Sequence, residues 1–278
     1  MNQPVSLDPQ EKRLFVDNLQ RFLKEEVAPH YDDWEKAGIW PRALWRRFGE
    51  QGFLCVDVPE AYGGYGVSFE LSCLVVDEVS KFGFGALASG LSVHSDIVAP
   101  YILNLGSEAQ KEKYLPGMVS GEIVGAIGMT EPSAGSDLQR IKTHAARDGD
   151  QFKINGQKTF ITNGQHCDLI VLATKTDPNQ GAKGMTLFTV DCASTGFNRG
   201  RNLDKMGLHS GDTSELFFDD LIVTTADILG GEGQGFVNMM KELPRERLIL
   251  GVGCVGAAQG AFDLTVAYIT ERQAFGQA

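Results

Sequence analysis

The hydrophobic pattern of the chain changes its period twice, near residue 122 and again near residue 235. Before the first change, apolar residues recur at helical spacing in four stretches, residues 11–29, 41–48, 69–81 and 86–105. Pro29 stops the first helix, and Pro41 starts the second. Ser107 with Gln110 predicts a capping box for a further helix through Leu115. These signals predict an N-terminal helical domain over residues 1–121.

Between residues 122 and 234, short β-branched and aromatic runs alternate with turn residues. The strand candidates are residues 123–127, 151–154, 158–161, 169–174, 185–190 and 215–223. Asp148-Gly149-Asp150 predicts a turn, and Asn155-Gly156 predicts a two-residue hairpin. Short strands at this spacing favour an antiparallel sandwich or barrel over βαβ units.

Helical character returns at Gly235, where two successive helices are predicted, from Phe236 to Gly253 and from Val255 to Arg272. The chain is therefore predicted to be an α+β multidomain protein. Its N-terminal helical domain would be followed by a β-domain over residues 122–234 and by helices over residues 235–278.

The composition is that of a globular protein, with 42% hydrophobic and 22% charged residues. A net charge of −11 argues against nucleic acid as the main partner. No uninterrupted apolar run approaches bilayer thickness, and the N-terminus lacks signal-peptide or transit character. We therefore expect a cytoplasmic protein without a membrane span. The five cysteines and five histidines show no metal-binding spacing, so we expect reduced thiols and no metal.

The most informative stretch runs from Ile127 to Gly164. Its apolar start ends in a polar turn, residues 130–137, in which Pro132 fixes φ and Gly135 permits positive φ. Such a turn can direct several backbone N–H groups at one point and so bind an anion or a carbonyl-rich ring. No general phosphate-binding fingerprint is present, and spacing alone favours an ordinary antiparallel hairpin with polar turns.

Two motifs in this stretch, MTEPSAGSD and INGQKTFITNG, resemble the flavin-contacting signature of the acyl-CoA dehydrogenases. KMGLHSGDTSELFFDDLIV is similar to a later β-domain segment of that family, and the chain after Leu229 is similar to its first C-terminal helices. MMKELPRERL particularly resembles the long-chain branch, with the isovaleryl branch close behind. The resemblance implies that the C-terminal domain continues for roughly a hundred more residues, so residues 235–278 would be only its start.

The resemblance implies FAD-dependent α,β-dehydrogenation of an acyl-CoA thioester to the trans-2-enoyl-CoA, with a medium or long chain in β-oxidation. A carboxylate takes the α-proton while a hydride leaves the β-carbon for flavin N5. Glu246 occupies the position at which the two branches carry this base. Without the resemblance, Glu246 would be assigned to a solvated ion pair with Arg245 or Arg247. Arg247 matches a residue that orients the carboxylate or the acyl-CoA head, and a surface ion pair is its alternative.

The resemblance also implies a set of flavin contacts: Ile127, Met129, Thr130, Gly135, Ser136, Phe160, Ile161 and Thr162. Ser136 would in addition lie near CoA. Phe160 stands where the family has tryptophan, which keeps ring stacking but reduces its area. The plainer interpretations are turn capping for the hydroxyls and core packing for the phenylalanine.

Arg272 and Phe275 match an R-x-x-F-G pattern that reaches the FAD of a neighbouring protomer, which implies a homo-oligomer, a dimer or a tetramer. An electron-transferring flavoprotein is the acceptor that the resemblance implies. Two alternatives remain open. One is an acyl-CoA oxidase or flavin monooxygenase-like member of the superfamily. The other is a non-catalytic or fragmentary acyl-CoA-binding or assembly subunit that does not hold FAD alone.

Overall fold

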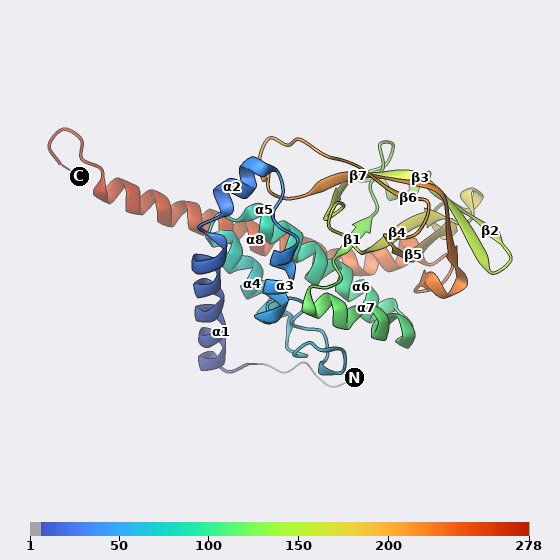
Figure 1. Ribbon diagram of the computed structural model, residues 1–278, viewed down its shortest axis with the longest axis horizontal. Coiled ribbons are helices and arrows are strands. Elements are labelled where there is room, and N and C mark those ends of the chain that lie inside the picture. The colour runs from blue at the N-terminus through green and yellow to red at the C-terminus, as the bar shows by residue number, and fades with distance from the viewer. Residues whose placement is uncertain (1–6, 278) are drawn as a thin grey trace.

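The computed structural model describes residues 7–277, and in it helices pack around one edge and one face of an eight-stranded sheet (Figure 1). The chain passes from helices to strands after Ser120 and returns to helix at Gly235. The helical stretches before the sheet are α1 (Pro9–Phe22), η1 (Leu23–Val27), α2 (Tyr31–Ala37), α3 (Ala43–Glu50), η2 (Glu60–Tyr62), α4 (Phe69–Lys81), α5 (Gly85–Ser92), η3 (Val93–Val98), α6 (Ala99–Leu105) and α7 (Glu108–Ser120).

The helices predicted from sequence are present, and their capping signals explain where two of them begin. Asp8 and Glu11 form a capping box at the start of α1. The predicted box at α7 is confirmed: Ser107 Oγ accepts from the Gln110 N–H at 3.3 Å, and Gln110 Oε1 accepts from the Ser107 N–H at 2.9 Å. The stretch Gly85–Leu105 is one continuous helical rod with a π-helical middle, η3, and it lies largely buried at the centre of the helical part.

The strands are β1 (Gly125–Gly128), β2 (His144–Asp148), β3 (Gln151–Thr162), β4 (Leu169–Lys175), β5 (Met185–Asp191), β6 (Phe197–Asn202), β7 (Thr213–Thr224) and β8 (Ile228–Leu229), with short helices η4 (Leu138–Arg140), η5 (Pro178–Gly184) and η6 (Thr225–Asp227) between them. Their order is β6-β7-β3-β2-β4-β5-β8, and β1 pairs with β4. Two strand pairs, β1 with β4 and β2 with β4, are parallel, so the sheet is mainly but not wholly antiparallel.

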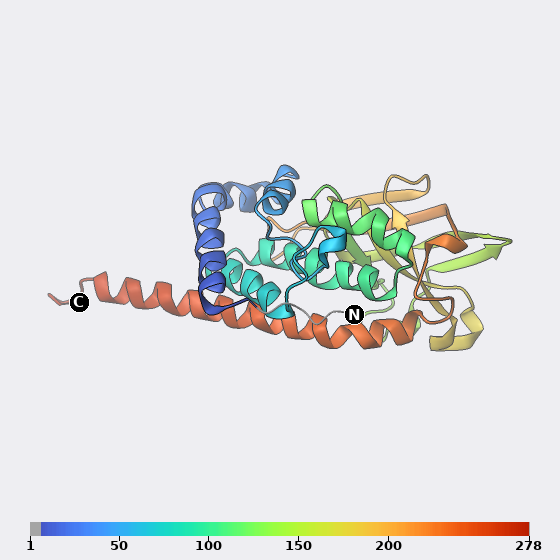
Figure 2. The same ribbon diagram turned by 90° about the horizontal axis from the view of Figure 1, so that it is seen from below.

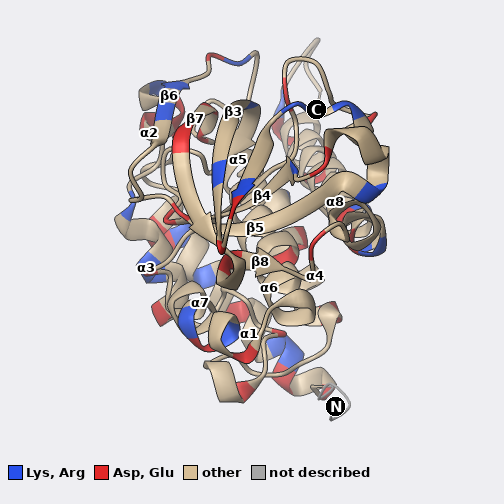
Figure 3. Cartoon of the chain, turned by 90° about the vertical axis from the view of Figure 1, so that its right-hand side faces the viewer, with Lys and Arg blue, Asp and Glu red and all other residues tan. Residues whose placement is uncertain are grey.

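The sheet consists of two halves that meet at a single bridge between His144 and Lys175. Buried aromatic and aliphatic side chains fill the space between the halves, among them Phe152 of β3 and Phe188 of β5, whose ring centroids lie 5.1 Å apart. The arrangement resembles a sandwich, as the strand spacing predicts. In the view of Figure 3, acidic and basic residues are interspersed along the ribbon rather than gathered by sign.

The predicted hairpin at Asn155-Gly156 is wrong, because both residues lie inside the continuous strand β3. The turn that reverses the chain is Asp148-Gly149-Asp150, which joins β2 to β3. Gly156 sits at a bulge where β3 faces β7, and a Cβ there would lie 2.4 Å from Thr143 Oγ1. The glycine therefore permits a close approach of two backbones rather than a tight turn.

The two predicted C-terminal helices are also wrong as separate elements, since α8 runs unbroken from Gly235 to Glu271. Its glycines pack rather than break the helix: a Cβ at Gly256 would lie 2.7 Å from Asp77 O, and one at Gly260 would lie 2.2 Å from Lys81 O. The helix therefore lies directly against α4. Beyond that contact it projects from the body of the molecule, with large exposed apolar residues such as Phe262 and Ile269 (Figure 2).

Two helical stretches of the described chain have the length and mean hydropathy of a membrane span. Gly85–Leu105 is 72% buried across its most apolar window, which is typical of the core helix of a globular domain. In α8 the corresponding window is 17% buried.

Candidate active site

A buried ion pair links strand β3 to the polar turn of residues 130–137, called the Thr130 turn below. Lys158 Nζ lies 2.8 Å from Glu131 Oε1, and the two side chains are 0% and 3% exposed. Lys158 also donates to the carbonyl of Met129 at 3.1 Å. The Glu131 carboxylate accepts the backbone N–H groups of Lys142 at 2.6 Å and Thr143 at 3.0 Å. The start of the turn is thus held against β3 and against residues 142–143.

The ionisation of this pair follows from burial and from its partners. Burial lowers the pKa of Lys158 to about 8, although Glu131 acts in the opposite direction. Burial raises the pKa of Glu131, but the Lys158 ammonium and the hydrogen bonds outweigh it and leave that pKa below its usual value. Both groups are therefore charged at neutral pH, and the opposite charge of each offsets the cost of burying the other.

The structure places the Thr130 turn next to the part of β3 that carries the second quoted motif, INGQKTFITNG. The Thr159 N–H donates to the Thr130 carbonyl at 2.9 Å. At this point β3 bulges away from its β7 register, and Phe160 adopts a left-handed backbone with φ of 57°. Its ring is 67% exposed, whereas Ile161 is buried and Thr162 is half-buried.

The rest of the turn has the character of a recognition loop. Gly135 and Ser136 are exposed, and a Cβ at Gly135 would meet open space. Within residues 7–277, no acceptor lies against the N–H groups of these two residues. Ile127 and Met129, which lead into the turn, are half-buried and pack against the main apolar core. Free N–H groups, a free hydroxyl and an exposed aromatic ring beside them fit the carbonyls and ring face of a flavin.

Glu246 lies on the buried side of α8 and does not form the ion pair that spacing alone suggests. Its Oε1 accepts a hydrogen bond from the Tyr101 hydroxyl at 3.0 Å. Burial raises the pKa of Glu246, with a further contribution from Glu242, while Tyr101 and Arg247 act against the rise. A half-buried carboxyl with a raised pKa is suited to accept a proton near neutral pH.

Tyr101 belongs to the main core cluster of the chain. The Tyr101 side chain is fully buried and belongs to the same apolar cluster that Ile127 and Met129 contact. Strand β1 lies along η3, the helical segment immediately before α6. Glu246 thus meets the Gly85–Leu105 rod at Tyr101, while its neighbour Arg245 pairs with Asp57.

Three further predicted residues form no hydrogen bond or ion pair with these groups within the described chain. Arg247 is exposed and forms no ion pair within the described chain. Arg272 and Phe275 follow the end of α8, at the tip farthest from the sheet (Figure 1), and both are exposed. Arg272 instead contacts the Tyr268 hydroxyl of its own helix. Within this chain, neither residue is brought to the Thr130 turn.

Sequence reasoning missed Tyr101, Glu131 and Lys158. The first could have been suspected, because a tyrosine in an otherwise apolar helix needs a partner for its hydroxyl. Glu131 and Lys158 stand inside the two quoted motifs, and a charge of each sign in neighbouring buried segments is a signal for an ion pair.

The chain matches three family models in order along its length. They are described as the N-terminal, middle and C-terminal domains of acyl-CoA dehydrogenase, and they match residues 9–122, 126–221 and 233–278. A solved acyl-CoA dehydrogenase from Geobacillus kaustophilus is 48% identical with a TM-score of 0.93, over 98% of this chain and 71% of that one. The chain belongs to the acyl-CoA dehydrogenase family.

Other members of this family are similar to the chain at lower identity. The mitochondrial long-chain specific acyl-CoA dehydrogenase of Sus scrofa is 42% identical over 269 residues, 96% of this chain and 62% of that protein. The chain therefore spans less than two thirds of that relative. A glutaryl-CoA dehydrogenase of Mycobacterium smegmatis, solved with FADH2, is 29% identical with a TM-score of 0.89, over 98% of this chain and 68% of that one. Acyl-CoA dehydrogenases bind FAD, and the residues around the Thr130 turn fit it.

Proposed function

We propose that the protein containing this chain dehydrogenates an acyl-CoA thioester between its α- and β-carbons, with Glu246 as the base. The observation that carries the proposal is the half-buried Glu246 carboxyl, hydrogen-bonded to Tyr101 and with a raised pKa. When bound, FAD supplies a hydride acceptor at N5. The chain's own residues must then remove the α-proton and stabilise the enolate that forms.

The residues divide this work between two sides. On one side, the free N–H groups at Gly135 and Ser136 and the exposed Phe160 ring hold the flavin, with Ile127, Met129, Thr130, Ile161 and Thr162 forming the surrounding wall. On the other side, Glu246 takes the proton, and Arg247 and Ser136 contact the CoA portion. Placing base and acceptor on opposite sides of the acyl chain lets both bonds break in one geometry.

The experiment that tests this activity is anaerobic reduction of the flavin. The protein is loaded with FAD and mixed with a saturated acyl-CoA, and the flavin's visible absorbance is followed. We expect the flavin to bleach rapidly in the wild type and in Glu242→Gln, but not in Glu246→Gln. Glu242 is the matched control because it is also a glutamate of α8, one turn before Glu246. Equal bleaching by both variants would exclude Glu246 as the base.

The preferred acyl group is proposed to be a medium or long saturated chain in β-oxidation. The MMKELPRERL segment and the 42% identity to a long-chain enzyme support this choice. Isovaleryl-CoA and butyryl-CoA dehydrogenases are also similar to the chain. The chain-length preference is tested by comparing rates of flavin reduction with acyl-CoAs of roughly four to sixteen carbons. A maximum at butyryl- or isovaleryl-CoA would contradict the proposal.

We further propose an electron-transferring flavoprotein as acceptor, a homo-oligomeric dimer or tetramer, and a cytoplasmic location. The exposed Arg272 and Phe275 at the tip of α8 support contact with the FAD of a second protomer. Arg272→Ala should weaken FAD binding and reduce the sedimenting mass, and unchanged values of both would contradict this role.

Two alternatives are separated from this proposal by simple measurements. An acyl-CoA oxidase would reoxidise its reduced flavin rapidly with oxygen, whereas a dehydrogenase would do so slowly and prefer a flavoprotein acceptor. A non-catalytic acyl-CoA-binding or assembly subunit would stay colourless when FAD is added.

A further inference from the structure

Arg245, the residue before the proposed base, is held by three elements of the N-terminal part. Its Nη2 lies 2.5 Å from Asp57 Oδ2, in the loop after α3, and 3.7 Å from Asp96 Oδ1, in η3. Its guanidinium carbon lies 4.2 Å from the ring centre of Phe69, at the start of α4. Asp57 and Asp96 are 11% and 3% exposed, so the guanidinium is the cation that these two carboxyls face.

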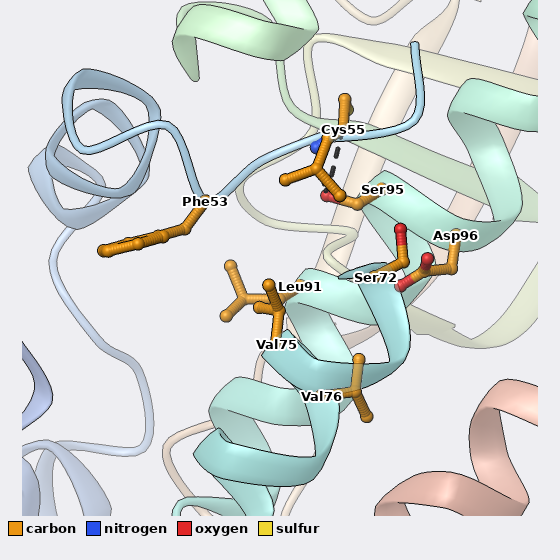
Figure 4. A pocket seen from close by; sticks show the side chains of 9 residues that line it. Phe53, Cys55, Ser72, Val75, Val76, Leu91, Ser95 and Asp96 are labelled. Atoms are coloured by element: carbon orange, nitrogen blue, oxygen red, sulfur yellow. Dashed lines mark hydrogen bonds between the residues drawn. The ribbon is translucent and has the colours of Figure 1, made fainter. Parts of the chain in front are cut away.

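Asp96 belongs to a small cavity between η3 and α4, where Ser72 points toward its carboxyl and Cys55 and Ser95 line the far side (Figure 4). Within the described chain, Asp96 Oδ1 and Arg245 Nε are buried without a hydrogen-bond partner. Asp57 therefore makes the tight contact and Asp96 the longer one. Among residues 7–277, neither carboxyl has a second cation in contact.

This contact fixes how α8 is turned about its axis. Consecutive residues of an α-helix point about 100° apart, so the direction of Arg245 determines that of Glu246. The two anchors also come from one rigid element: Asp96 and Tyr101 lie five residues apart on the continuous rod Gly85–Leu105. Arg245 meets the first and Glu246 meets the second.

We propose that Arg245 is a positioning residue, which locks the rotation of α8 through Asp57 and Asp96 so that the Glu246 carboxylate meets Tyr101 and the α-carbon of the substrate. The inference rests on the proposed function of Glu246. It adds a second role for the ELPRERL segment, in which neighbouring arginines differ: Arg245 is turned inward to the carboxyls and Arg247 is exposed.

The test uses a readout that does not depend on turnover. The chain has six tyrosines, so ¹³Cζ-tyrosine labelling of the FAD-loaded protein gives few signals, and Tyr101→Phe assigns the relevant one. Because the Tyr101 hydroxyl donates to Glu246 at 3.0 Å, we expect that signal to respond to ionisation of the Glu246 carboxyl. The other charged groups near Glu246 are Glu242 and Arg247 on its own helix, and Asn104 of α6 holds Glu242 at 3.1 and 3.3 Å.

Arg245→Met alone leaves two buried carboxyls without a cation and risks unfolding. The informative variant therefore combines Arg245→Met with Asp57→Asn and Asp96→Asn, which removes the lock and leaves no unpaired charge. We expect it to fold, to lose the Glu246-dependent titration of Tyr101, and to lose on the order of 10- to 100-fold in kcat with KM nearly unchanged. Arg245→Lys should recover part of both, and Lys241→Met, an exposed cation one turn earlier, should change neither.

A folded triple variant with the wild-type Tyr101 titration and wild-type kcat would overturn the positioning role. Failure of the proposed function has a different signature: Glu246→Gln would reduce flavin normally, whatever the Tyr101 signal does. A triple variant that does not fold leaves Arg245→Lys as the test, and a wild-type titration there together with wild-type kcat also contradicts the proposal.

Discussion

The hydroxyl of Tyr101 and the carboxylate of Glu246 join helices α6 and α8 through a hydrogen bond of 3.0 Å. The tyrosine is fully buried, so its hydroxyl depends on this acceptor, and the carboxylate gains a donor in surroundings that disfavour its charge. The bond therefore sets both where the proposed base lies and the pH at which it ionises.

Tyr101→Phe should move the acid limb of the kcat/KM profile to higher pH. The hydroxyl stabilises the carboxylate and so lowers the pKa of Glu246, while burial and Glu242 raise it. Removing the donor leaves only the raising effects and Arg247, and we expect a shift of about one unit. Because the base must be ionised, activity falls below the limb and changes little above it. A limb that stays in place would show that Tyr101 does not contact the ionising group.

Lys158→Met should destabilise the protein by about 3–5 kcal/mol, because it leaves the Glu131 carboxylate buried without its cation. The double variant Lys158→Met with Glu131→Gln should recover much of this loss, since no uncompensated charge remains. Chemical unfolding monitored by circular dichroism measures both. A single variant as stable as the wild type would mean that the pair does not fasten the Thr130 turn.

Gly156→Ala should cost about 1–3 kcal/mol, because its Cβ would overlap the backbone and side chain of Thr143 on the neighbouring segment. Gly207→Ala is the matched control, since a Cβ at Gly207 meets nothing within 4 Å and its φ is not positive. Equal thermal midpoints for the two variants would argue against the close approach at the bulge.

Asp96→Asn should remove a pH dependence of stability. Burial raises the pKa of Asp96 to about 7, with Arg245 acting in the opposite direction. Between about pH 4 and 7 the folded state keeps a proton that the unfolded chain has released, so the wild type loses stability as pH rises through that window. The variant lacks this loss, and its advantage should grow by up to about 4 kcal/mol from pH 4 to pH 7. An advantage that is constant with pH would contradict the raised pKa.

The helical part of the fold could be predicted from sequence because its signals are local. Ser107 and Gln110 cap their own helix, and the apolar spacing of residues 69–81 alone marks the bounds of α4. The order of helices, strands and helix follows from the same periodicities.

The errors share a different cause, which is contact between distant segments. Asn155-Gly156 has the sequence of a turn, but both residues lie inside β3, where the close approach of Thr143 requires a glycine at position 156. Glycine disfavours a helix, but two glycines of α8, Gly256 and Gly260, lie where the helix packs closely against the α4 segment. A glycine has the same local signature in either role.

The candidate site divides in the same way. The resemblance of two motifs implies that the Thr130 turn and Phe160 contact one flavin, and the Thr159 N–H donates to the Thr130 carbonyl at 2.9 Å, so the two segments are adjacent. The partners of Glu246 and Arg245 lie about 145 to 190 residues away, on α6 and in the loop after α3. No spacing rule reaches across such a separation.

The central claim is that Glu246 removes the α-proton of an acyl-CoA, and anaerobic flavin reduction by the Glu246→Gln protein tests it most directly. With FAD bound as in the wild type, we expect reduction to slow by about 10²–10⁴-fold while the flavin spectrum before mixing is unchanged. Reduction of the variant's flavin at the wild-type rate would contradict the account.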